Sequence, residues 1–125
     1  MRIVDAGVVV ELVAGNLDPD RLGDDELAAP HLLDSEVLQA LRGLVRRREM
    51  TDAQATIALA GFTALTIRRF AADWLRSRIW ELRHNLTAYD ATYVALAELS
   101  GAEALLTTDA RLAQAPGVRC PVRLL

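Results

Sequence analysis

The chain has 125 residues, of which 52% are hydrophobic and 25% are charged, and its formal net charge is −3. This composition is typical of one globular domain over residues 1–125 and excludes a disordered chain. No apolar run approaches the ~18–20 residues that a membrane-spanning helix needs. Cys120 is the single cysteine, so the chain has no intrachain disulfide or all-cysteine zinc site, and a reducing cytoplasm is the expected location.

The charges are unevenly distributed along the chain. Residues 1–36 hold nine acidic residues against two arginines, whereas residues 37–83 hold nine arginines against four acidic residues. Every one of the fourteen basic residues is arginine. The absence of lysine excludes P-loop nucleotide binding, Schiff-base chemistry and lysine-dependent phosphoryl transfer.

The first half of the chain alternates short apolar runs with helical patterns. "RIVD" reads as a strand that ends at Asp5 and leads into a helix closed by Gly15. The acidic "NLDPDRLGDDE" reads as a loop with a helical turn, and "LAAP" as a second strand. A long amphipathic helix is predicted to start at Pro30 and to run through "HLLDSEVLQALRGLVRRR".

The second half continues the alternation. Thr51 is predicted to cap the helix "DAQATIALAGF", and the β-branched "TALTI" (63–67) is predicted as a third strand. One helix is expected through "FAADWLRSRIWELRHN", with Trp74 and Trp80 in the core or at an interface. Thr87 should cap the next helix, and "ALLTTD" (104–109) and "PVRLL" read as the last strands.

This order predicts an α/β fold with a central, mostly parallel sheet flanked by helices. Strands that alternate with helices of about ten residues form right-handed βαβ units. In open parallel sheets the functional site lies beyond the carboxyl ends of the strands. Asp5 and Asp109 both follow predicted strands, so we expect them at the same edge.

Four carboxylates deserve comparison with simpler explanations. Asp5 and Asp109 could each cap the helix that follows, and Asp90 could be the capping-box partner of Thr87. Glu36 could face solvent or pair with an arginine such as Arg42. If the four lie together, however, each pair repels by roughly 4 kcal/mol at ~4 Å in a medium of effective dielectric constant ~20. A divalent cation would remove that conflict, and oxygen ligands favour Mg²⁺ or Mn²⁺ over zinc.

Four segments of the chain resemble the acidic motifs of PIN-domain ribonucleases, and more specifically of VapC-type toxins of bacterial toxin–antitoxin pairs. They are "IVDAGVVVEL", "HLLDSEVLQAL", "NLTAYDATYVALAE" and "LLTTDARLA", in the same order and spacing. The resemblance implies that the catalytic and metal-binding quartet is Asp5, Glu36, Asp90 and Asp109. It also implies that Thr107 supports the site with its hydroxyl.

The resemblance further implies an endoribonuclease that hydrolyses RNA phosphodiesters with a water activated by Mg²⁺, or alternatively by Mn²⁺. Asp5, Asp90 and Asp109 would be the main metal ligands, and Glu36 would act behind them or hold a second ion. Arg83 matches a position that is commonly basic in relatives. Position 7 departs from the pattern, because it is glycine where many relatives carry serine, so another donor such as a backbone N–H must replace that hydroxyl.

Three partners follow from the resemblance: an RNA substrate, a VapB-type antitoxin that blocks the acidic site, and a second copy of the chain in a homodimer. No membrane is involved. Four arginines after Glu36 could guide an RNA backbone toward the site or could simply form a solvated helix end favoured by the helix dipole. They are Arg42, Arg46, Arg47 and Arg48.

Other α/β folds with acidic clusters fit less well. A receiver domain requires a lysine after a late strand, and the chain has no lysine. A haloacid-dehalogenase-like phosphatase also requires a lysine, together with a D-x-D motif after the first strand, where this chain has Asp5 followed by Ala6 and Gly7. The alternative that remains is a non-catalytic PIN-like module that binds RNA or protein.

Overall fold

The computed structural model describes residues 1–125 and contains one five-stranded, fully parallel sheet. The strand order is β3-β2-β1-β4-β5, so β1 lies at the centre. The segments between the strands return the chain to the same end of the sheet each time, so all five strands run in one direction. The strands are β1 (Arg2–Val4), β2 (Leu27–Pro30), β3 (Ile67–Phe70), β4 (Ala104–Thr107) and β5 (Val122–Leu124).

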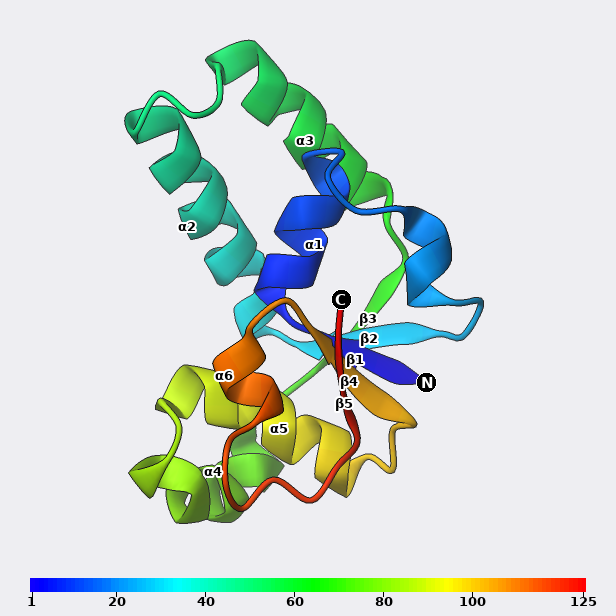
Figure 1. Ribbon diagram of the computed structural model, residues 1–125, viewed down its shortest axis with the longest axis vertical. Coiled ribbons are helices and arrows are strands. Elements are labelled where there is room, and N and C mark those ends of the chain that lie inside the picture. Colours follow the sequence, from blue (N-terminus) through cyan, green and yellow to red (C-terminus); the bar gives the residue numbers. More distant parts are fainter.

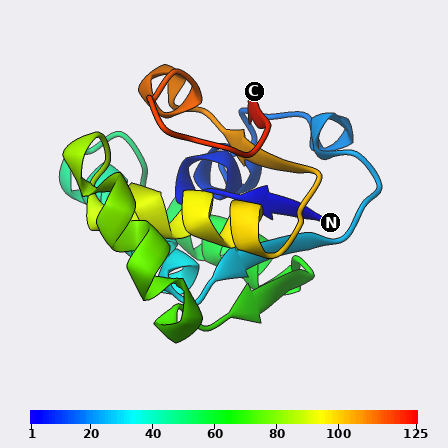
Figure 2. The same ribbon diagram turned by 90° about the horizontal axis from the view of Figure 1, so that it is seen from below.

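Helices cover both faces of the sheet. In Figure 1, α1, α2 and α3 lie on one side and α4 and α5 on the other, while Figure 2 shows α6 near the β4–β5 side. The helices are α1 (Ala6–Val13), α2 (Leu32–Arg46), α3 (Asp52–Ala64), α4 (Arg76–Glu81), α5 (Ala88–Leu99) and α6 (Ala110–Ala113). Short 3₁₀ turns cover Pro19–Leu22, Asp73–Leu75 and Leu82–His84.

The core is built around β1 and α5. Ile3 and Val4 of β1 are completely buried, and α5 is buried continuously from Ala91 to Ala97. The buried stretch follows directly after Asp90, so the core fixes the helix that carries this residue. Val94 and Ala97, on the same face as Asp90, are buried and anchor this helix.

The α/β architecture, the parallel sheet and four of the five strands agree with the sequence prediction, but the third strand was placed wrongly. Thr63 belongs to α3, where its hydroxyl donates to the carbonyl of Leu59, and β3 begins only at Ile67. The capping box of Thr51 and Gln54 fixes the start of the helix, and the helix continues past Gly61 to Ala64. The two arginines of the "IRRF" strand concealed its β character.

The predicted helix through residues 70–85 is also wrong in extent. Phe70 ends β3, and two 3₁₀ turns frame the short α4. Trp74 and Trp80 are 47% and 67% exposed, so neither is a core residue. Pro30 ends β2, opposite Phe70, and α2 starts at Leu32.

None of the helices combines the length and the apolar character required to cross a membrane.

Candidate active site

Asp5 lies at the carboxyl end of the central strand, beside the end of β4. Its backbone N–H donates to the carbonyl of Leu106, which ties the two strand ends together at 3.1 Å. Its carboxylate accepts the N–H of Val8 at 2.9 Å and also the hydroxyl of Thr107. The predicted capping of α1 by Asp5 is therefore confirmed, and the same contacts fix the direction of the side chain.

Thr107 connects Asp5 to Asp109. Its side chain is completely buried, and its hydroxyl oxygen also accepts the N–H of Asp109 at 3.0 Å. Asp109 in turn caps α6 by accepting the N–H of Arg111 at 2.9 Å. The supporting position predicted for Thr107 thus has a clear geometry, because one buried hydroxyl orients both the first and the last aspartate.

Asp90 reaches the same edge from the first turn of α5. Its N–H donates to the hydroxyl of Thr87 at 3.1 Å, as the predicted N-cap requires. Asp90 and Asp109 face one open pocket of about 210 Å³. The pocket is lined by Asn85, Leu86, Thr87, Asp90, Asp109, Arg111 and Leu112.

The three aspartates act on each other electrostatically. Burial raises the pKa of Asp5 above its ordinary value of 3.8, the hydrogen bonds from Thr107 and Val8 oppose that shift, and the charges of Asp90 and Asp109 add to it. Burial also raises the pKa of Asp90, and the charge of Asp109 raises it further. The carboxyl groups of Asp5 and Asp90 therefore ionise less readily than ordinary aspartates.

Glu36 approaches the cluster from α2 through a residue that the sequence reasoning missed. The hydroxyl of the buried Tyr93 donates to Glu36 Oε1 at 2.6 Å. The pKa of Tyr93 is raised by burial, by this bond, and by the charges of Glu36, Asp5 and Asp90, so its hydroxyl lies among them. Tyr93 follows Asp90 by three residues on one helix, which places both side chains on the same face, and this spacing could have indicated Tyr93 from the sequence. Glu36 is therefore bonded to Tyr93 rather than to Arg42.

The chemistry of these side chains suits a divalent cation. No three His, Cys, Asp or Glu side chains, however, lie close enough together to form a complete metal site. The donors at this edge are carboxylate and hydroxyl oxygens, which suit hard cations. Arg111 is the nearest basic side chain recorded at the pocket, but it is 96% exposed and its Nε lies 3.9 Å from Asp109 Oδ1. The mutual repulsion of Asp5, Asp90 and Asp109 therefore has no buried cation to balance it.

Arg83 does not contact the acidic cluster. Its guanidinium stacks over the ring of Trp80 at 4.4 Å and donates to the Trp80 carbonyl at 2.7 Å. Of the four arginines expected on one helix, Arg42 and Arg46 lie on α2, whereas Arg47 and Arg48 follow its end. An RNA-guiding role for these residues stays a prediction.

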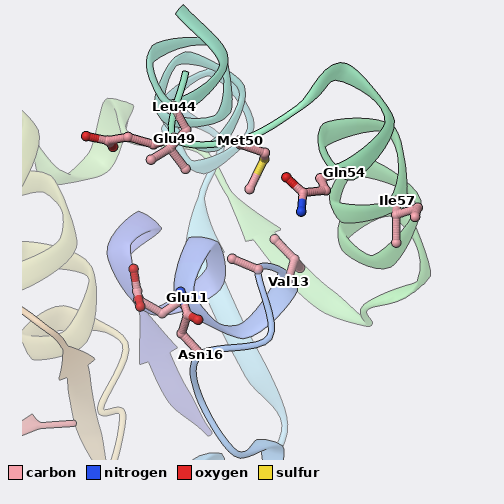
Figure 3. A pocket seen from close by; sticks show the side chains of 9 residues that line it. Glu11, Val13, Asn16, Leu44, Glu49, Met50, Gln54 and Ile57 are labelled. Atoms are coloured by element: carbon pink, nitrogen blue, oxygen red, sulfur yellow. The ribbon is translucent and has the colours of Figure 1, made fainter. Parts of the chain in front are cut away.

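A larger cavity of about 340 Å³ lies away from the aspartates, where the end of α1 faces the α2–α3 turn and α3 (Figure 3). Asp5 begins α1, and eight helical residues span about 12 Å. The walls mix apolar side chains such as Val13, Leu44 and Ile57 with Gln54, Asn16 and two glutamates. None of the predicted site residues lines this cavity, so it does not compete with the acidic edge as the candidate site.

Comparison with known proteins agrees with this geometry. Residues 2–118 match the PIN domain family. The chain is 42% identical to Ribonuclease VapC1 of Mycobacterium tuberculosis, with 98% of this chain and 96% of that protein covered. It is 37% identical to Ribonuclease VapC9 of the same species, with 100% and 98% covered.

Two solved structures share the fold. PAE2754 from Pyrobaculum aerophilum superposes with a TM-score of 0.72 at 26% identity, covering 97% of this chain and 81% of that one. A toxin–antitoxin complex from Klebsiella pneumoniae gives a TM-score of 0.61 at 17% identity, with both chains covered completely. With its five-stranded parallel sheet and its aspartates at the carboxyl edge, the chain belongs to the PIN domain family and, within it, to the VapC ribonucleases.

Proposed function

We propose that this protein is a metal-dependent endoribonuclease and the toxin of a VapBC-type toxin–antitoxin pair, with residues 1–125 forming its PIN domain. The observation that carries the proposal is the set of three mutually repelling aspartates at the carboxyl edge of the sheet. Similar proteins over the full chain are named ribonucleases, which supports the reaction class.

Asp5, Asp90 and Asp109 would hold Mg²⁺, or Mn²⁺ in its place, with Glu36 beside them. When bound, such an ion lowers the pKa of a water molecule and offsets the negative charge that develops on the phosphate. Asp5 is oriented by Thr107 and Val8, so it contributes a fixed ligand. Asp90 and Asp109 border the open pocket, where a phosphodiester could enter.

Glu36 is the candidate to accept the proton of the attacking water. Tyr93 holds one of its oxygens, which leaves the other free to act as a base. No histidine belongs to the proposed quartet, so we assign this role to a carboxylate.

The proposed partners are RNA, a VapB-type antitoxin and a second copy of the chain. A solved relative of the same fold is described as a toxin–antitoxin complex, which supports the antitoxin. An antitoxin arginine inserted among the aspartates would supply the missing positive charge. Because the substrate is RNA, we place the protein in the cytoplasm. A non-catalytic binding module would not need four acids at this edge, so we do not favour it.

The test is RNA cleavage by the purified protein with Mg²⁺, with EDTA, and by Asp90→Asn with Mg²⁺. Asp52→Asn is the matched control, since Asp52 also lies in the first turn of a helix, α3, but is exposed. We expect wild type and Asp52→Asn to cleave, and EDTA and Asp90→Asn to abolish cleavage. Equal cleavage by wild type and Asp90→Asn would refute the proposed site.

A further inference from the structure

The glycine at position 7 is explained by a neighbouring side chain and not by its backbone conformation. Gly7 is the second residue of α1, and its φ is not among the positive values that favour glycine. A glycine at an ordinary helical φ destabilises a helix relative to alanine. Some other requirement must therefore account for the missing side chain.

That requirement is the hydroxyl of Thr108. A Cβ atom on Gly7 would lie only 2.6 Å from Thr108 Oγ1 and 3.5 Å from Asp5 Oδ1. The absence of a side chain at position 7 thus leaves room for a hydroxyl that comes from the other side of the site, after β4. The two segments share one small space beside Asp5.

The Thr108 hydroxyl is also free to act on a ligand. Its neighbour Thr107 is buried and uses its hydroxyl on Asp5 and Asp109, whereas Thr108 is exposed and makes no side-chain hydrogen bond within the chain. It therefore presents a neutral donor close to the carboxylate of Asp5. Threonine hydroxyls commonly bind phosphate oxygens of nucleic acids.

We propose that Thr108 donates a hydrogen bond to a phosphate oxygen of the bound RNA and that Gly7 is glycine to leave space for it. This inference rests on the proposed function, because it assigns a positioning residue to that same site. It also answers which donor replaces a side-chain hydroxyl at position 7: a hydroxyl from position 108 fills the space.

The test is a set of paired substitutions. Thr108→Ala deletes the hydroxyl, and Gly7→Ala displaces it by the close approach of the new methyl group. Both should weaken binding of a labelled single-stranded RNA, measured by fluorescence anisotropy with Ca²⁺ in place of Mg²⁺, by about tenfold, the loss expected for one hydrogen bond to a charged group. The kcat/KM for cleavage with Mg²⁺ should fall at least as much.

The sharpest expectation concerns the double variants. Because both single changes remove the same hydroxyl, Gly7→Ala/Thr108→Ala should bind RNA no more weakly than Thr108→Ala alone. Gly7→Ser/Thr108→Ala should recover much of the loss, since serine returns a hydroxyl to the shared space. Thr66→Ala and Gly61→Ala are the matched controls. Thr66 is an exposed threonine that precedes β3, at the opposite edge of the sheet, and Gly61 is a helical glycine with only ordinary contacts.

The inference is overturned if Thr108→Ala binds and cleaves RNA like wild type, or if the losses of the two alanine variants multiply. Melting temperatures of all variants check that each one is folded. If the wild type binds RNA and the variants follow the expected order but no RNA is cleaved, the proposed nuclease fails while the role of Thr108 stands. A wild type that neither binds nor cleaves RNA overturns both.

Discussion

Replacing Tyr93 by phenylalanine removes a single hydroxyl from the centre of the molecule. The ring keeps its place, because Tyr93 is 2% exposed and is packed by α5 against the sheet. What is lost is the 2.6 Å bond to Glu36 Oε1. The change therefore isolates one contact between the core and the candidate site.

A hydrogen bond to a charged group contributes about 1.5–3 kcal/mol. Glu36 is only partly buried, so water can replace part of the lost bond, and we expect the lower end, about 1.5 kcal/mol. For a domain of this size that loss corresponds to a melting temperature lower by about 6 °C. Cleavage should also fall, but by less than in Glu36→Gln, because Tyr93 only positions the carboxylate.

Urea unfolding of Tyr93→Phe, Glu36→Gln and the double variant measures this effect. Tyr89→Phe is the matched control, since Tyr89 lies one turn earlier on α5, is 62% exposed and makes no side-chain hydrogen bond. The double variant should lose less stability than the sum of the single ones. The reasoning is refuted if Tyr93→Phe unfolds like wild type or if Tyr89→Phe loses as much.

Three further predictions concern charge. The pKa of Asp90 is raised above 3.8 in the folded protein, so ionisation of Asp90 lowers the stability of the fold as pH rises through that folded pKa. In EDTA at neutral pH, Asp90→Asn should therefore melt at a higher temperature than wild type. This difference in melting temperature should shrink as pH falls toward 3.8. Mg²⁺ at 100 times its Kd should stabilise wild type by about 2.7 kcal/mol in thermal melts and leave Asp90→Asn nearly unchanged. Arg78 and Glu98 form an ion pair at 2.6 Å with only 10% and 7% of their side chains exposed, so Glu98→Gln should lower the free energy of unfolding by about 3 kcal/mol in urea titrations. Arg123→Met, which breaks the exposed pair with Glu103, should lower it by less than about 1 kcal/mol.

Much of the fold could be predicted because local signals and global topology agree. Asp5, Thr51, Thr87 and Asp109 each cap the helix that the sequence assigns to them. The strand ends at Val4 and Thr107 follow from short apolar runs that stop at polar residues. Since parallel strands place their carboxyl ends at one edge, the meeting of Asp5 and Asp109 follows from these local assignments.

The remaining features depend on contacts that a single sequence does not display. Arg69 makes β3 look polar, yet its guanidinium is held by Asp34 of α2 at 2.8 Å and lies 5.6 Å from the centre of the Phe62 ring. The bond from Tyr93 to Glu36 joins residues 57 positions apart. The conflict between a side chain at position 7 and Thr108 is likewise visible only in three dimensions.

The central position of β1 has a consequence for the order of events during synthesis. Asp5 emerges first, but the hydroxyl that orients it belongs to Thr107, 102 positions later. Domains are made from the N-terminus onward, and such distant pairing is slow to form. A growing chain that has not passed Ala104 lacks β4 as well as Thr107 and Asp109. We therefore expect the proposed nuclease activity only after these residues have been made, and we expect fragments from interrupted synthesis to lack a complete site.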